Sequence, residues 1–547
     1  MSAGERGRAI LPTRPVDNSY HRAGLWEGRD IASFLDEQVR LRPHALAVVD
    51  GSVRLTFEEL SERVGSLAAE LENLGVTPGR TVLVQLPNWW EALVAFHAVV
   101  RLGAIVNPVI PIYREAEISF IVGQTDPAAI IIPGRFRGVD YEQMVSRALG
   151  EARSDTAVVV VRPETAQDHR GIPFDGLLGG QPTPATSSRP AIGSGDITLL
   201  LYTSGTTAAP KGVLHSHDTL VYECRSIATV CGLGDDMSVF MPSPLTHITG
   251  FLYGFLMPAM LGCPVALLDV WDPKRAVDVI EESGARFMAA ATPFLKNLTE
   301  EYQRLGRPSA LRYFACGGAD VPPDLVRHAA TVLGCYVSRV YGSSEFPTFT
   351  FGPREATEYQ RAETDGYPVG EVQFRLDEVA DGVGELLVRG PELFHGYLDA
   401  GLNDDAFTED GFFRTGDLAS VEDDGFIRIR GRKKDIIIRK GENISAREVE
   451  DHLYAHESVR DVAVIAMPDP ERGERVCAVV VSDVPDLGLG DLTEHLARRG
   501  LAKQKWPEQI EFVTELPRTA SGKVQKFVLR AMLTDPEGVA DRAGSGT

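Results

Sequence analysis

The sequence predicts an α/β protein with a large N-terminal domain, built on doubly wound, mostly parallel sheets with a β-rich subdomain, and a small C-terminal α/β domain. Three observations lead to this prediction. The chain has 547 residues, which is too long for a single hydrophobic core. Over much of it, short apolar runs alternate with segments of helical apolar spacing, as in βαβ units. Between 367 and 433 the pattern changes to short strands, glycine turns and acidic loops.

The alternation can be followed along the chain from residue 31 to residue 340, interrupted by a loop-rich stretch at 151–195. Helical spacing predicts helices, and short apolar runs predict the strands between them. The predicted helices are 31–40, 57–74, 89–101, 118–124, 219–230 and 278–284. The predicted strands are 81–86, 103–109, 128–132, 197–202, 265–268, 286–290, 312–316 and 335–340.

A second, smaller α/β unit follows the basic run at 428–440. We place the domain boundary between Lys433 and Lys434, which gives domains 1–433 and 434–547. The predicted elements of the second domain are helices at 446–456 and 492–499, paired strands at 461–467 and 476–482, and a strand at 509–513.

Composition and charge narrow the function classes. Hydrophobic content of 44% with 24% charged residues is ordinary for a soluble globular protein. The net charge of −22 argues against a nucleic-acid binder but allows small anionic ligands, which need only local positive charge. Six scattered cysteines indicate reduced thiols in a cytoplasmic protein, with no metal cluster. We see no signal peptide and no apolar run long enough to span a membrane.

The most informative stretch is 200–212, where an apolar strand enters a loop of small hydroxyls and glycine that closes on one lysine. A glycine lets the backbone approach a polyphosphate closely, and inward N–H groups form an anion nest. The spacing is not that of a Walker A loop, and a solvated turn is the alternative interpretation. The predicted phosphate-binding residues are Thr203, Ser204, Gly205, Thr206, Thr207 and Lys211.

Four further motifs have chemistry that fits a nucleotide, although each alone could be a surface turn or a solvated side chain. A hydroxyl beside a carboxylate can hold phosphate and Mg²⁺ together, and a carboxylate supported by an arginine can accept from ribose hydroxyls. The motifs are Tyr341-Gly342-Ser343-Ser344-Glu345, Gly317-Gly318-Ala319, Asp417 with Arg432, and Lys523 within 517–526.

In this order, over about 30–540, the motifs resemble those of the adenylate-forming superfamily. That family contains acyl- and aryl-CoA synthetases, the adenylation domains of non-ribosomal peptide synthetases, and beetle luciferases. The resemblance implies that the chain joins a carboxylic acid to ATP as an acyl-adenylate, releases pyrophosphate, and passes the acyl group to a thiol. ATP, Mg²⁺ and CoA are the cofactors and co-substrates it implies.

The resemblance also implies roles for single residues. Glu345 and Thr206 would bind Mg²⁺, Tyr341 would stack on adenine, and 317–319 would follow the adenine edge. Asp417 and Arg432 would hold the ribose. Lys523 would contact the substrate carboxylate and the α-phosphate, where a fixed ammonium stabilises the charge that develops in the transition state. Acetylation of Lys523 is a plausible switch, because it would remove that charge.

A hinge is implied at Lys434, about which the small domain would move. Rotation would withdraw Lys523 and bring in a thiolation face formed by Lys440, Gly441 and Glu442. A side chain at position 441 would obstruct the thiol. One chain would thus run two reactions by domain motion.

The acyl pocket is expected near 243–250, with His247, Thr249, Phe251 and Gly317 as its residues. No Asp or Glu lies in that segment to pair with an ammonium group, so we expect a non-amino acid with an apolar body. The segments 87–91 and 107–115 resemble those of medium-chain and cyclohexanecarboxylate CoA ligases.

Several alternatives stay open on the sequence alone. The chain could hand acyl-AMP to a separate thiolating enzyme or carrier protein, act as a luciferase-like oxygenase, or be a non-catalytic nucleotide-binding regulator. We expect a monomer or a homodimer.

Overall fold

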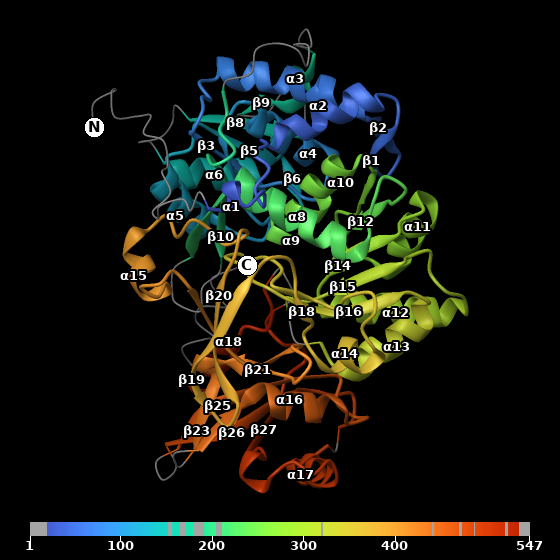
Figure 1. Cartoon of the computed structure of the whole chain (residues 1–547), viewed down its shortest axis with the longest axis vertical. Coiled ribbons are helices and arrows are strands. Elements are labelled where there is room, and N and C mark those ends of the chain that lie inside the picture. Colours follow the sequence, from blue (N-terminus) through green and yellow to red (C-terminus); the bar gives the residue numbers. More distant parts are fainter. Residues whose placement is uncertain are drawn as a thin grey trace.

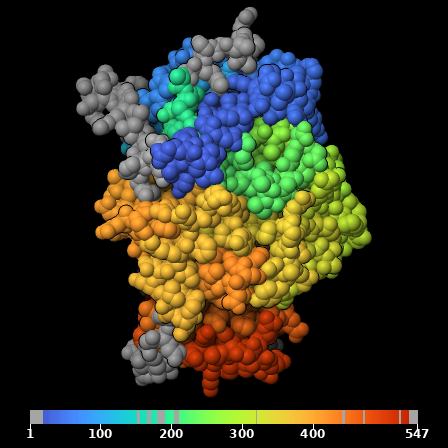
Figure 2. Space-filling model, viewed as in Figure 1, coloured from blue at the N-terminus to red at the C-terminus, as the bar shows by residue number. Residues whose placement is uncertain are grey.

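The structure is a computed structural model that describes residues 19–150, 156–164, 171–179, 191–203, 210–318, 321–439, 442–469, 473–485, 487–519 and 523–534. The chain runs from N-terminal elements at the top of Figure 1, in blue, to C-terminal elements at the bottom, in red. Figure 2 shows the red C-terminal residues gathered at one end of the molecule. The predicted α/β class is confirmed.

The larger sheet has nine strands in the order β18-β17-β16-β15-β14-β12-β13-β1-β2. Its central strands run parallel, and the strands at its two edges pair antiparallel. The bounds are β1 Leu46–Asp50, β2 Val53–Thr56, β12 Val239–Met241, β13 Val265–Leu267, β14 Phe287–Ala290, β15 Tyr313–Cys316, β16 Tyr336–Tyr341, β17 Thr350–Phe351 and β18 Tyr367–Pro368.

The second sheet has seven strands in the order β11-β10-β4-β3-β5-β8-β9, and all pairs except β10 with β11 are parallel. Between β5 and β8 in the sequence, β6 (Arg135–Phe136) and β7 (Val139–Asp140) form a separate antiparallel ribbon. The bounds are β3 Thr81–Val84, β4 Ile105–Pro108, β5 Ala129–Pro133, β8 Ala157–Val161, β9 Ile172–Pro173, β10 Ile197–Thr203 and β11 Lys211–Ser216.

Helices lie at the predicted positions, with ends set by their caps, and the structure adds helices that were not predicted, among them α6, α12 and α13. Helix α11, for example, ends where 278–284 predicts a helix end, and it begins at Pro273 because Asp272 caps it. The helices are α1 Ser19–Arg22, α2 Ala32–Leu41, α3 Phe57–Asn73, α4 Trp90–Arg101, α5 Glu115–Thr125, α6 Tyr141–Leu149, α7 Phe174–Leu178, α8 His217–Cys231, α9 Ile248–Gly250, the π-helical turn η2 Phe251–Leu256, α10 Met257–Leu261, α11 Pro273–Ser283, α12 Thr292–Leu305, α13 Pro323–Leu333 and α14 Glu358–Glu363.

The two sheets and their helices form successive layers. The main core joins the facing sides of both sheets and encloses α4, which is apolar and buried all round. A second core lies between the other face of the larger sheet and helices α11, α12 and α13. A third lies between the other face of the second sheet and helices α5 and α6. This layering places the ends of several strands next to one another, where the predicted motifs lie.

A four-stranded antiparallel sheet forms the β-rich part, as predicted from 367–433. The C-terminal part builds a five-stranded sheet with helices packed on it, and the predicted strand pair is β25 with β26. The bounds are β19 Gln373–Ala380, β20 Val383–Arg389, η3 Ala400–Leu402, α15 Asn403–Ala406, β21 Phe413–Val421, β22 Ile427–Arg432, η4 Lys433–Asp435, β23 Ile436–Arg439, β24 Glu442–Ser445, α16 Ala446–Tyr454, β25 Asp461–Asp469, β26 Gly473–Val481, α17 Leu489–Arg498, η5 Lys503–Lys505, β27 Gln509–Phe512 and α18 Lys526–Thr534.

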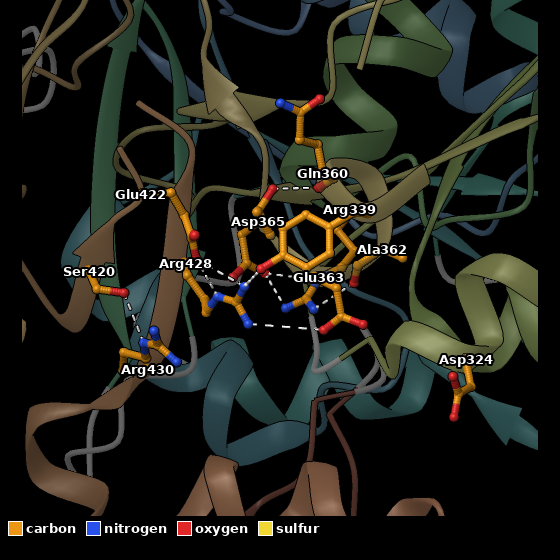
Figure 3. Close-up of polar contacts among 12 residues, drawn as sticks. Asp324, Arg339, Gln360, Ala362, Glu363, Asp365, Ser420, Glu422, Arg428 and Arg430 are labelled. Atoms are coloured by element: carbon orange, nitrogen blue, oxygen red, sulfur yellow. Dashed lines mark hydrogen bonds and ion pairs between the residues drawn. The ribbon is translucent and has the colours of Figure 1, made fainter. Parts of the chain in front are cut away.

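A buried carboxylate ties the C-terminal part to the rest of the chain. Asp365, which follows α14, accepts from Nη2 of Arg339 on β16 at 2.6 Å and from Nη2 of Arg447 on α16 at 3.2 Å. The Ile429 N–H donates to its other oxygen at 2.7 Å. Figure 3 shows Asp365 beside Arg339. A domain boundary between Lys433 and Lys434 stays a prediction; Lys433 begins the turn η4.

Within the described residues, none of the helices has both the length and the apolar character that a membrane crossing requires.

Candidate nucleotide and acyl site

The phosphate loop lies between two paired strands. Thr203, at the end of β10, is the antiparallel partner of Lys211, at the start of β11. The pairing holds the two ends of the loop side by side. Ser204, Gly205, Thr206 and Thr207 lie outside the described residues.

A second segment, 394–398, runs along the free side of β11. His395 N–H donates to the Leu214 carbonyl and Leu398 N–H to the Gly212 carbonyl, both at 2.8 Å. Between them, Tyr397 forms a β-bridge with Val213. The pairing places the Tyr397 side chain next to Lys211, the residue at which β11 begins.

Tyr397 connects two of the predicted site residues. Its hydroxyl donates to Oε1 of Glu345 at 2.8 Å. The Nζ of Lys211 lies 5.0 Å from the centroid of its ring, within the range of a cation–π contact. Tyr397 is not among the residues predicted from the sequence, because only the pairing of 394–398 with β11 brings it to the site.

The turn 341–345 is held by close backbone packing. A Cβ on Gly342 would lie 1.7 Å from the Pro347 carbonyl oxygen, so no other residue fits there. Ser343 N–H donates to the Phe346 carbonyl at 2.8 Å. The Ser344 carbonyl contacts Nε2 of His215, on β11, at 2.8 Å. The turn is therefore fixed against the strand that begins at Lys211.

The predicted ribose pair is formed by register. Asp417 of β21 lies opposite Arg432 of β22, and Nε of Arg432 contacts its Oδ1 at 3.0 Å. The Tyr341 hydroxyl donates to Oδ2 of Asp417 at 2.6 Å. Burial and the Asp417 charge together raise the pKa of Tyr341 well above its ordinary value. Asp417 thus has one charged and one neutral donor.

The predicted adenine-edge glycines follow β15. A Cβ on Gly317 would lie 2.5 Å from both the carbonyl oxygen and Cγ2 of Val340, which explains a glycine there. Gly318 has φ +79°, in the region that favours glycine. Ala319 lies outside the described residues. Gly317 follows β15 and Tyr341 ends the neighbouring parallel strand β16, so these two motifs meet at one sheet edge.

The predicted acyl segment is held by one amide that the sequence analysis did not identify. Asn88 is buried; its Nδ2 donates to the carbonyls of Met241 at 3.1 Å and Ser243 at 2.9 Å, and its Oδ1 accepts from Leu245 N–H at 2.8 Å. All of its hydrogen-bonding groups are therefore used in shaping 241–245.

His247 precedes the short helix α9, and its Nδ1 accepts from Thr249 N–H at 3.4 Å. Although part of the residue reaches the surface, desolvation lowers the pKa of His247 to about 4, so the imidazole is neutral at pH 7. Phe251 is fully buried against Phe96 and Phe255, with ring centroids 5.4 and 4.8 Å away. Its position as a pocket residue stays a prediction.

The C-terminal site residues lie on separate elements. Lys523 is hydrogen-bonded to Thr519: the Thr519 N–H donates to the Lys523 carbonyl at 2.8 Å, and the Lys523 N–H donates to Thr519 Oγ1 at 3.1 Å. Glu442 begins β24 and pairs with Arg439. Lys440 and Gly441 lie outside the described residues.

The predicted hinge residue, Lys434, lies in the electrostatic field of the nucleotide residues. Desolvation, with the charges of Arg432 and Lys211, lowers the pKa of Lys434 to about 8, against the opposing effect of Asp435 and Asp417. Among the predicted residues, Lys211, Tyr341, Glu345, Asp417 and Arg432 are thus gathered in one region. The chemical role of each stays a prediction.

The chain matches the model of the AMP-binding enzymes over residues 35–398 and that of the AMP-binding enzyme C-terminal domain over 448–523. It belongs to this family. The resemblance drawn from the motifs is thereby confirmed, and the chain is an adenylate-forming ligase.

Two relatives differ in the products that their names imply. The chain is 33% identical to the medium-chain fatty-acid–CoA ligase of Escherichia coli K12, over 94% of this chain and 92% of the relative. It is 30% identical to the 2,3-dihydroxybenzoate-AMP ligase of Bacillus subtilis, over 94% of this chain and 96% of the relative.

Among solved structures, the ATP-bound form of MatB from Rhodopseudomonas palustris matches with a TM-score of 0.82 at 27% identity, over 92% of this chain and 99% of that one. The apo form of the same protein matches with a TM-score of 0.73 over similar lengths. The two matches have almost the same identity and coverage, so the difference in TM-score means that the backbone of this chain superposes better on the ATP-bound form than on the apo form.

Proposed function

We propose that this ligase activates a non-amino carboxylic acid with ATP and Mg²⁺ and then transfers the acyl group to CoA. The observation that carries the proposal is the cluster of Lys211, Glu345, Asp417 and Arg432, in which the carboxylates keep acceptor capacity and Lys211 forms no ion pair with Glu345 within the described part of the chain. Such a cluster suits a ligand that has both phosphates and hydroxyls.

In the first half-reaction, a carboxylate oxygen of the acid attacks the α-phosphorus of ATP. The bond from that phosphorus to the bridging oxygen breaks, and pyrophosphate leaves with the electron pair. Lys211 would place positive charge beside the polyphosphate, and Asp417 would accept from the ribose hydroxyls. Lys523 would stabilise the negative charge between the two anionic reactants.

The residues also suit a Mg²⁺ ion, which prefers oxygen ligands and retains several waters. The half-buried Glu345 carboxylate would hold it, together with the Thr206 hydroxyl. When bound, Mg²⁺ would offset the charge of the nucleotide phosphates. Tyr397 supplies Glu345 with a neutral donor, so this hydrogen bond orients the carboxylate without placing a positive charge beside it.

The wall of the predicted acyl pocket supports an apolar acid. The Asn88 side-chain amide is hydrogen-bonded to the backbone, and the Ser243 hydroxyl donates to the Ala289 carbonyl at 3.0 Å. The His247 imidazole is neutral. A substrate ammonium would find no counter-charge in 243–250 and would be buried at a large free-energy cost. We therefore propose an aliphatic, alicyclic or aromatic acid.

CoA as the acceptor rests on the 440–442 segment and on the resemblance to CoA ligases. In the second half-reaction the CoA sulfur would attack the acyl carbonyl, AMP would leave, and the thiol proton would pass to solvent. The alternative is release of acyl-AMP to a carrier protein or to another enzyme. It is favoured by the similarity to a relative that is named an AMP ligase.

Pyrophosphate release against a panel of acids, with and without CoA, tests the proposal. The panel contains fatty acids of increasing chain length, cyclohexane and benzoic acids, polycyclic acids and amino acids, and mass spectrometry follows acyl-AMP and acyl-CoA. Acyl-CoA from an apolar acid is the expected product. Acyl-AMP that accumulates despite CoA would favour the alternative, and turnover of amino acids alone would contradict the proposed substrate class.

The variant Gly441→Leu separates the two half-reactions. A side chain at this position is expected to obstruct the thiol, so acyl-CoA formation should fall at least tenfold, about 1.4 kcal/mol in activation free energy, while acyl-AMP forms at the wild-type rate. Rapid-quench measurement of both products gives the result. Equal loss of the two products would contradict a thiolation face at 440–442.

A further inference from the structure

We propose that Tyr397 is a positioning residue that holds the Glu345 carboxylate and the Lys211 ammonium apart and aims each at the bound nucleotide. The inference rests on the proposed function, because it gives both charged groups a nucleotide or metal partner. It concerns a residue that touches no substrate atom in the proposed reaction and acts through its two neighbours.

The Tyr397 side chain has one fixed position. It is 3% exposed and packs edge-on against Phe394, with ring centroids 4.9 Å apart. Its backbone bridges Val213, and its N–H donates to Oδ1 of Asn403 at 2.8 Å. Since a tyrosine side chain has only two rotatable torsions before its hydroxyl, this packing sets where the hydroxyl and the ring face lie.

The hydroxyl determines the orientation of the Glu345 carboxylate. Within the described part of the chain, its contact with Oε1 is the carboxylate's one hydrogen bond. The terminal torsion of a glutamate is broad, so a carboxylate without such a bond samples many orientations. A neutral hydroxyl fixes the carboxylate without pairing its charge, whereas an arginine in the same place would neutralise it.

The ring determines the position of Lys211. Its Nζ lies 5.0 Å from the ring centroid, and Lys211 and Glu345, both described, make no ion pair with each other. A lysine and a glutamate at one site would otherwise attract each other strongly in a partly buried environment. By taking a contact with each, the tyrosine keeps one cation and one anion separate, so that both remain available to ligands of opposite charge.

The chain contains a matched control far from this site. Tyr302 of α12 is also buried; its hydroxyl donates to Oε1 of Glu281 at 2.8 Å, and the Arg307 guanidinium lies 5.8 Å from its ring centroid. The same three kinds of group meet there without any predicted site residue. In that cluster, unlike the site, cation and carboxylate also pair directly, at 3.1 Å.

The test compares Tyr397→Phe, Tyr397→Leu and Tyr302→Phe with the wild type. Calorimetric titration measures ATP binding over a range of Mg²⁺ concentrations and again in EDTA, and urea unfolding reports stability. Tyr397→Phe should raise the Mg²⁺ concentration for half-maximal ATP affinity roughly 10- to 100-fold, because a hydrogen bond to a charged group is lost. ATP binding in EDTA should not change, since the ring remains.

Tyr397→Leu should show the same Mg²⁺ shift and also bind ATP several-fold more weakly in EDTA, because the ring that holds Lys211 is gone. Tyr302→Phe should leave both titrations at wild-type values even where it lowers stability as much as Tyr397→Phe does. In a Glu345→Gln background, Tyr397→Phe should add no further Mg²⁺ shift.

An unchanged Mg²⁺ dependence in Tyr397→Phe, or an equal shift in Tyr302→Phe, would overturn the proposal. So would an additive effect in the Glu345→Gln background. Pyrophosphate release by the wild type is measured in parallel, with and without a carboxylic-acid substrate. If the wild type releases pyrophosphate only with the substrate, while Tyr397→Phe shows the wild-type Mg²⁺ dependence of ATP binding, the positioning role fails and the proposed function stands.

Discussion

Two carboxylates in this chain, Asp365 and Glu345, differ in how completely their charges are matched. Asp365 accepts from two arginines and a backbone N–H, and Figure 3 shows one of these arginines, Arg339, beside it. Although burial acts in the opposite direction, the charges of Arg339 and Arg447 hold the pKa of Asp365 below its ordinary value. The Glu345 carboxylate accepts only from the Tyr397 hydroxyl within the described part of the chain.

The difference separates structural groups from site groups. Replacing a carboxylate whose charge is matched inside the protein destabilises the fold, because it leaves its partners buried and unpaired. A carboxylate that is oriented by a neutral donor keeps its charge for a ligand. Asp417 is intermediate, with one arginine and one tyrosine. The contrast predicts opposite signatures in activity and stability when each kind of group is replaced.

The largest effect on activity is expected when a charged group of the ligand site is replaced. In Lys523→Ala, acyl-AMP formation should fall about a hundredfold to a thousandfold, because a fixed charge that stabilises the transition state is lost. Thiolation of supplied acyl-AMP should largely remain, and the urea midpoint should change little. Pyrophosphate release and acyl-CoA formation are measured separately. Near-normal pyrophosphate release would contradict the role given to Lys523.

On the structural side, Asp365→Ala should lower the free energy of unfolding by about 3–5 kcal/mol, because Arg339 and Arg447 would be left buried without their carboxylate. Urea unfolding measures the change. Asp410→Ala is the control: Asp410 pairs with Arg375 at the surface, so a much smaller change is expected. Equal losses in the two variants would contradict the distinction.

A third buried carboxylate, Glu223, lets the contrast be sharpened by pH. The Tyr253 hydroxyl donates to it at 2.5 Å, and burial raises the pKa of Glu223 to about 7 despite that bond. A raised folded-state pKa gives stability that is present below pH 4.5 and is lost as pH rises through 7. The loss attributable to this group is of the order of 3 kcal/mol, at 1.36 kcal/mol per pKa unit.

The variant Glu223→Gln should remove that loss. Between pH 5 and pH 8, the wild type should lose stability relative to Glu223→Gln, as measured by urea unfolding at both pH values. A variant with the same pH dependence as the wild type would show that Glu223 ionises at its ordinary pKa. Asp365→Asn provides the comparison of opposite sign, because the wild-type contribution of that group is lost as pH falls.

Most of the elements predicted from local apolar spacing are present in the fold. Helix α4 and the run that becomes β10 were predicted within a few residues, because apolar spacing directly reflects which side chains are buried. Strand β11 was not predicted: its residues include Gly212, His215 and Ser216, and besides its partner β10 it pairs with 394–398, far along the chain. Long-range pairing of this kind leaves no periodic signal.

The same limit applies to the site. Motifs with glycines, hydroxyls and charges indicated Lys211, Tyr341, Asp417 and Arg432, which the fold then brings together. Tyr397 and Asn88 were missed, because each acts by holding another group and neither residue type indicates that role in the sequence. Resemblance to a family supplied the roles of residues, which spacing alone could not.

Exchange of labelled pyrophosphate into ATP tests the central claim most directly, because it reports reversible formation of the acyl-adenylate without any acceptor. We predict exchange that depends on an apolar carboxylic acid and on Mg²⁺, and that is lost in Lys523→Ala. Exchange that is absent with every acid, or ATP hydrolysis that is independent of any acid, would contradict the account.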